Sequence, residues 1–97
     1  MIKAQVSLYV FNYSGDRGDI IREFWKIMKS FNLEFKANAF STIIWSEDED
    51  KLFNALNYAF KELRKYGIIL DIKISNIGPH PSYEIRSDEI WRVYILH

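Results

Sequence analysis

The stretch Lys3-Ala4-Gln5-Val6-Ser7-Leu8-Tyr9-Val10-Phe11 alternates apolar and polar residues along its length. A period of two is typical of a β-strand that buries one face. The alternation predicts that Gln5, Ser7 and Tyr9 share the face opposite the core. The turn-forming cluster at 12–16 ends the strand.

The period changes after this turn. From Gly18 to Phe31 apolar residues recur every three or four positions, which predicts an amphipathic helix with Asn32 as its C-cap. Two short runs follow. In 33–37 apolar and charged residues alternate, and 41–45 is rich in β-branched and aromatic residues, so the two predict a hairpin.

The second half repeats this order. Ser46 and Glu49 have the spacing of a capping box, so we expect a helix to begin there and to stop at Gly67. Its predicted core face comprises Leu52, Leu56, Ala59, Phe60 and Leu63. Ile68 to Ser75 then alternates again, with Ile69, Asp71, Lys73 and Ser75 predicted to lie on the open face.

The predicted order β-α-β-β-α-β is the split pattern of the ferredoxin-like α+β fold. Two helices would cover one face of a four-stranded antiparallel sheet, with the first and third strands at its centre. Residues 1–80 would form this domain and 81–97 a C-terminal extension. The apolar run Ile90–Leu96 favours an edge strand in that extension, while Ser87-Asp88 could instead cap a short helix. The extension would pack on the core or on a neighbouring subunit.

The amino-acid composition argues against several classes of function. The 97 residues include thirteen basic and thirteen acidic side chains, so the basic excess typical of nucleic-acid binders is missing. There is no cysteine, which excludes disulfides and thiol catalysis. No apolar run approaches membrane-spanning length, and we expect a cytoplasmic protein that binds neither membrane nor nucleic acid.

The open face of the sheet is the predicted functional surface. The first strand contributes Gln5, Ser7 and Tyr9, and the last contributes Asp71 and Lys73. From the third strand, either Thr42 with Ile44 or Ile43 with Trp45 joins them, because the residues leave the parity open. An apolar platform with a few hydrogen-bonding groups is the usual composition of a small-molecule site. A merely solvated face would look the same.

Three segments carry a resemblance to a known family. Ala4–Tyr9, Phe40–Ile44 and Ile72–Ile74 resemble, in order and spacing, motifs of the thiamine-binding-protein (YkoF-type) family. The resemblance implies a ferredoxin-like fold, assembly into a homodimer or homotetramer through the sheets, and binding of thiamine or its hydroxymethylpyrimidine moiety. Carried over by position, it points to Gln5, Ser7, Tyr9, Thr42 and Lys73. Phe40-Ser41 stands where the family has Met-Gly, and the tail after Pro81 is additional.

Such a ligand suits the chemistry of the predicted face. An aminopyrimidine offers a planar surface to Tyr9 or Trp45, and its nitrogens can bond Gln5, Ser7 or Thr42. An aromatic face or Asp71 could hold the thiazolium cation. The predicted ligand site is therefore Gln5, Ser7, Tyr9, Thr42, Ile44, Asp71 and Lys73, with no catalytic residue, no metal and no cofactor.

Two other functions remain open. The first is an oligomerisation module without ligand, in which Trp91, Val93 and Ile95 cover a neighbour's sheet. The second is a hydrolase of the acylphosphatase type, for which Arg17 is the only candidate for the phosphate-binding loop. The acidic run at 47–50 is explained by the dipole of the helix it precedes and does not require a metal.

Overall fold

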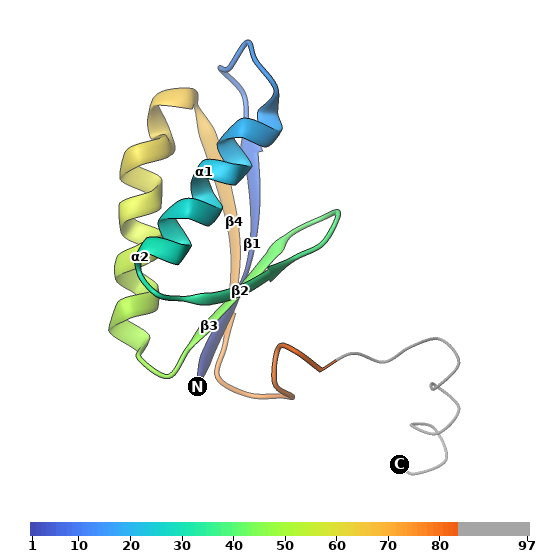
Figure 1. The fold of residues 1–97 in the computed structure, drawn as a ribbon, viewed down its shortest axis with the longest axis vertical. Coiled ribbons are helices and arrows are strands. Elements are labelled where there is room, and N and C mark those ends of the chain that lie inside the picture. The colour runs from blue at the N-terminus through green and yellow to red at the C-terminus, as the bar shows by residue number, and fades with distance from the viewer. Residues whose placement is uncertain (84–97) are drawn as a thin grey trace, which may run out of the picture.

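The computed structural model describes residues 1–83, and these form one sheet with two helices (Figure 1). The observed order is that of the ferredoxin-like fold predicted from the sequence. The elements are β1 (Ile2–Val10), α1 (Arg17–Ser30), β2 (Glu34–Ala37), β3 (Thr42–Ser46), α2 (Glu49–Leu63), a 3₁₀ turn (Arg64–Tyr66) and β4 (Ile68–Ser75).

The sheet is antiparallel with the strand order β2-β3-β1-β4, so β1 and β3 are central as expected. Both helices lie against the same face (Figure 1). Neither helix among residues 1–83 is long and apolar enough to cross a membrane.

The core lies between the helices and this face of the sheet. Phe24 and Met28 of α1, Leu52 and Leu63 of α2, and Ile44 of β3 are all at most 1% exposed. The small residues Ala4, Ala55 and Ala59 are equally buried, and they let the helices approach the sheet closely. Phe60, predicted on the core side of α2, is 44% exposed, because the buried stripe runs through Leu52, Ala55, Leu56, Ala59 and Leu63 instead.

The helix boundaries follow local backbone chemistry. Asp48, rather than the predicted Ser46, caps α2: its Oδ1 accepts the N–H of Lys51 at 3.2 Å. Ser46 lies in β3, and its hydroxyl accepts the N–H of Asp48. The helical segment ends at Gly67 as expected, where φ is +63°. Adding a Cβ there would bring it 2.6 Å from the side-chain nitrogen of Asn12, so both φ and space favour glycine.

The pairing register resolves which residues of β3 lie on the open face. Gln5 lies opposite both Ile43 and Lys73, and Lys3 lies opposite Trp45. Directly opposed residues in an antiparallel pair share a face. Ile43 and Trp45 are therefore on the open face, whereas Thr42 and Ile44 face the helices.

The segment after β4 folds back over one end of the open face. Lys3 Nζ donates to the carbonyl of Pro79 at 2.7 Å, and the rings of Trp45 and His80 meet edge to face at 5.7 Å. Pro81, in the same segment, is buried. The apolar run Ile90–Leu96, predicted as a strand or short helix, lies outside the described residues.

Candidate functional site

The polar side chains predicted from β1 and β4 do come together. Ser7 lies opposite Asp71, and Gln5 lies opposite Lys73. These four residues line a hollow of about 60 Å³ on the open face. Small-molecule sites usually measure about 300 Å³ or more. The hollow can accept one polar group of a ligand, but it cannot enclose a heterocycle.

A larger cleft lies where β1 extends beyond the end of its pairing with β3. Pairing between the two strands stops at Val6 opposite Thr42, whereas β1 stays paired with β4 as far as Val10. Residues 38–41 turn away from β1 at this point (Figure 1). The space between the end of β1, α1 and this loop is a cleft of about 300 Å³.

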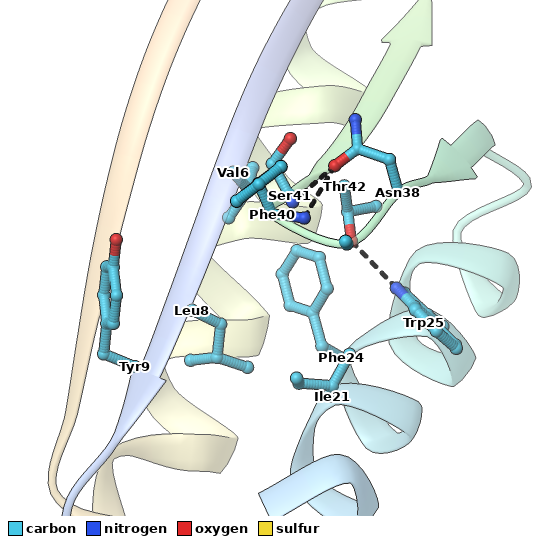
Figure 2. Close-up of a pocket in the computed structure, with 11 residues that line it drawn as sticks. Val6, Leu8, Tyr9, Ile21, Phe24, Trp25, Asn38, Phe40, Ser41 and Thr42 are labelled. Carbon is cyan, nitrogen blue, oxygen red and sulfur yellow. Dashed lines mark hydrogen bonds between the residues drawn. The ribbon is translucent and has the colours of Figure 1, made fainter.

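The side chain of Asn38 determines the shape of the loop. Its Oδ1 accepts the backbone N–H groups of Phe40 and Ser41 at 2.8 and 3.0 Å (Figure 2). The backbone N–H of Asn38 also donates to the carbonyl of Ser41 at 3.0 Å. An Asn side chain that bonds the backbone two or three residues ahead is a common way to hold a tight turn. Its amide nitrogen has no hydrogen-bond partner within residues 1–83 and is available to a ligand.

The floor of the cleft is apolar and its rim is polar. Leu8, Ile21 and Phe24 face one another between β1 and α1 (Figure 2). Trp25 Nε1 donates to Thr42 Oγ1 at 2.8 Å, and the Trp25 ring stacks on Phe35 with centroids 6.3 Å apart. The cleft is lined by Val6, Leu8, Tyr9, Ile21, Phe24, Trp25, Asn38, Ala39, Phe40, Ser41 and Thr42.

The predicted site residues thus occupy three places. Gln5, Ser7, Asp71 and Lys73 lie on the open face, and Tyr9 lies at the end of that face and also borders the cleft. Grouping Thr42 and Ile44 with them was wrong. Thr42 lines the cleft on the helix-covered side, and Ile44, 0% exposed in the core, presents no surface to a ligand.

The loop connects the two faces through hydrogen bonds. Gln5 Nε2 donates to Ser41 Oγ at 3.1 Å, and Ser7 Oγ donates to the carbonyl of Phe40 at 3.4 Å. Gln5 and Ser7 therefore position the loop from the open face, while Thr42 contacts the cleft. Sequence reasoning missed Trp25 and Asn38. The Asn-x-x-Ser spacing of residues 38–41, which suits a side-chain-bonded turn, is the signal that could have indicated the second of them.

Charge is concentrated away from the cleft, whose lining contains no ionisable group other than Tyr9. Shifted pKa values occur instead at the start of α1. Hydrogen bonds from Arg22 and Tyr13 lower the pKa of Asp19, and the bond to Asp19 raises the pKa of Tyr13. The Arg22–Asp19 distance is 2.6 Å and the Tyr13–Asp19 distance is 3.2 Å. This exposed cluster is a local ion pair that stabilises the first turn.

The residues considered from sequence for a phosphate-binding loop or a metal site have structural roles at the starts of the two helices. Arg17 is an exposed first residue of α1, and its neighbour Asp16 caps the helix by accepting the N–H of Gly18. The acidic run at 47–50 supplies the cap and first turn of α2. No group of three or more potential metal-ligating side chains occurs among residues 1–83.

Comparison with solved structures shows what this fold resembles. A hypothetical protein from Methanocaldococcus jannascii superposes with a TM-score of 0.69 at 16% identity, over 96% of this chain and 94% of that one. A domain of unknown function, DUF77, from Bacillus cereus gives 0.64 at 18% identity, over 94% and 88%. A Thermotoga maritima protein named "putative thiamine biosynthesis/salvage protein" gives 0.66 at 10% identity, over 96% and 97%.

These likenesses concern the fold. No protein-family model matches the chain, and no curated protein matches it by sequence. At identities of 10–18% the neighbours establish a shared ferredoxin-like architecture and no shared ligand.

Proposed function

We propose that this protein binds a small, planar nitrogen heterocycle of the aminopyrimidine type in the cleft between β1, α1 and the loop at 38–41. The observation that carries the proposal is the cleft itself, about 300 Å³ in volume, with an apolar floor and a polar rim. An apolar cavity with a few convergent polar groups is the usual form of a small-molecule site.

The groups around the cleft match such a ring. Leu8, Ile21 and Phe24 offer apolar contact to its faces. The free amide nitrogen of Asn38 can donate to a ring nitrogen, and the hydroxyl of Thr42 has a second lone pair for an exocyclic amino group. Phe40, 87% exposed at the rim, is placed to close over a bound ring by stacking.

The lack of a carboxylate in the lining favours a neutral ring over a cation. If thiamine binds, its hydroxymethylpyrimidine part would occupy the cleft. Its thiazolium would remain near the aromatic rings of Phe40 and Tyr9 at the mouth, where a cation can be held without a buried counter-charge. The name of the Thermotoga maritima neighbour is a reason to test these compounds first.

Calorimetric titration with hydroxymethylpyrimidine and with thiamine tests this proposal. We expect saturable binding with one site per chain. Filling the cleft with Ala39→Trp should abolish it, because residue 39 lines the cleft on an exposed loop that tolerates a larger side chain. Asn38→Ala should weaken binding at least about tenfold, because it removes both the donor to the ligand and the two hydrogen bonds that hold the loop.

A matched pair of variants separates the cleft from the open face. Lys73→Ala lies outside the cleft, and we expect it to leave the affinity unchanged. Loss of binding in Lys73→Ala with retention in Ala39→Trp would instead assign the ligand to the open face. No heat with either compound from the folded protein would contradict the proposed ligand class.

A specific observation favours an oligomerisation module as the second candidate. Tyr9 and Ile69 are directly opposed on the open face and are 51% and 52% exposed. Contiguous exposed apolar residues of this kind often mark a protein interface. A homo-oligomer with no affinity for the two compounds would favour this function.

A further inference from the structure

A second pocket lies between the open face of the sheet and the segment that follows β4. Lys3, Ile43 and Lys73, from three adjacent strands, line it on one side, and residues 79–81 and 83 line it on the other. Its volume is about 310 Å³, which is within the range of small-molecule sites. This end pocket lies near the start of β1 and shares no lining residue with the cleft.

Specific hydrogen bonds hold the second side of the end pocket in place. Ser75 Oγ accepts the N–H of Ile77 and donates to the carbonyl of the same residue, both at 3.1 Å. Lys3 Nζ donates to the carbonyl of Pro79, and Gly78, with φ at +92°, lies so close that a Cβ there would be 3.2 Å from this Nζ. Because the chain's own contacts order this side, a ligand has little further ordering to impose.

The charged groups in the lining of the end pocket are positive. Lys3 and Lys73 both belong to it, and no aspartate or glutamate of the described chain does. Neither lysine forms an ion pair with any residue in the range 1–83, including Asp71, which borders the neighbouring hollow. Lys3 uses one of its three N–H groups on Pro79 and keeps two for a ligand. An anion can therefore contact two cations without displacing a carboxylate.

The rest of the lining is largely apolar. Ile43 is half-buried on the sheet, Pro81 is buried in the facing segment, and Tyr83 is 55% exposed. An exposed aromatic ring in the wall of a pocket offers a surface on which a second flat ring can stack. A ligand that satisfies both parts of the lining has one anionic group and a planar apolar body.

We propose that the end pocket binds a small aromatic anion, with its carboxylate or phosphate group at Lys3 and Lys73 and its ring against Ile43 and Tyr83. Charge-assisted hydrogen bonds from the two lysines fix the anionic group. The end pocket differs from the cleft in the charge that it accepts, since the cleft has no lysine or arginine in its lining. Binding here does not require a ligand in the cleft.

Calorimetric titration of the full chain with four single-ring compounds tests the charge of the ligand. Benzoate and phenyl phosphate carry an anionic group, benzyl alcohol keeps the ring without charge, and benzylamine reverses the charge. We expect saturable binding of at least one of the two anions. Benzyl alcohol should bind at least about tenfold more weakly and benzylamine not at all, because both lack the charge-assisted hydrogen bonds. The tighter of the two anions identifies the group that the lysines accept.

Three variants locate the site. Lys73→Gln removes one of the two charges, and the dissociation constant of the bound anion should rise about tenfold. Tyr83→Ala removes the ring from the wall and should raise it about threefold or more through the lost stacking. Lys26→Gln, at an exposed position of α1, removes the same charge elsewhere and should leave the dissociation constant unchanged.

Trp45 provides a spectroscopic readout of the end pocket. Its ring meets that of His80, which belongs to the lining, edge to face at 5.7 Å. When isotope-labelled protein is titrated with the anion, the indole resonance of Trp45 should shift. The indole resonance of Trp25, which lines the cleft, should not.

Four results would overturn the proposal. The first is no binding of either anion by the folded protein. The second is equal affinity for benzyl alcohol, or inorganic phosphate binding as tightly as phenyl phosphate, since either would remove one half of the ligand's chemistry. The third is an equal effect of Lys73→Gln and Lys26→Gln, which would reflect net charge alone. The fourth is a shift at Trp25 in place of Trp45. Affinity for hydroxymethylpyrimidine should be unchanged in Lys73→Gln whichever result is obtained, because Lys73 lies outside the cleft.

Discussion

The hydrogen bond between Trp25 and Thr42 is the contact that joins α1 to the start of β3 at the cleft. The Nε1–Oγ1 distance is 2.8 Å, and Thr42 is only 5% exposed. Thr42→Val replaces the hydroxyl with a methyl group of similar size, so no cavity forms. The indole N–H then loses the one hydrogen-bond partner that it has within residues 1–83, while Trp25 remains partly buried. An unsatisfied buried donor costs about 1–3 kcal/mol, and the partial exposure of Trp25 favours the lower half of that range.

We therefore expect Thr42→Val to lower the free energy of unfolding by about 1–2 kcal/mol. For a domain of this size each kcal/mol lowers the melting temperature by about 4–8 °C. Urea unfolding followed by far-ultraviolet circular dichroism measures the change. The slope of the unfolding free energy against urea concentration should be the same in the variant and the wild type. Ser7→Ala is the matched control, since the Ser7 hydroxyl makes only a long 3.4 Å contact, and its cost should stay below about 0.5 kcal/mol.

A double-mutant cycle isolates the bond from the surrounding packing. Trp25→Phe removes the donor and part of the stack on Phe35, so its own cost includes lost contacts. Combined with Thr42→Val, the two changes should be less than additive, with a coupling energy of about 1 kcal/mol. A coupling energy indistinguishable from zero would refute the assignment of the cost to this hydrogen bond.

Two further perturbations test other parts of the fold. Gly67→Ala should destabilise the protein by about 1–3 kcal/mol, because φ is +63° and a Cβ would lie 2.6 Å from the side chain of Asn12. Thermal unfolding of this variant and of the double variant Gly67→Ala/Asn12→Gly separates backbone strain from the steric contact. Full recovery of stability in the double variant would exclude backbone strain. Hydrogen bonds from Arg22 and Tyr13 lower the pKa of Asp19 in the folded protein below the usual value of an aspartate, so its stabilising contribution is present above about pH 4 and is lost as pH falls through the lowered pKa. The stability difference between wild type and Asp19→Asn, measured by urea unfolding, should shrink below that pH, and a constant difference would contradict the ion pair.

The order of the elements and the faces of two strands could be predicted from the sequence. In β1 and β4 polar residues such as Ser7 and Asp71 alternate with apolar residues that face the helices, so period alone identifies the open face. β3 could not be assigned in this way. Ile43, Ile44 and Trp45 are apolar on both faces, and a central strand covered on one side and half-buried on the other has no alternation to interpret.

The cleft could not be predicted because it depends on where pairing stops. β1 continues beyond Val6 while β3 begins only at Thr42, and neither boundary follows from propensity. The cap of α2 shows the same difficulty on a smaller scale: Ser46 and Asp48 can both cap a helix, and only the length of β3 selects the second.

The most direct test of the central claim is a titration of isotope-labelled protein with hydroxymethylpyrimidine, followed by amide and indole resonances. Trp25 reports on the cleft and Trp45 on the open face, so the protein carries an internal reporter for each surface. The proposed function predicts saturable shifts at the Trp25 indole, Leu8, Ile21 and Asn38, with Trp45 unchanged. Shifts confined to Trp45, Gln5 and Lys73, or no shift at all, would contradict binding in the cleft.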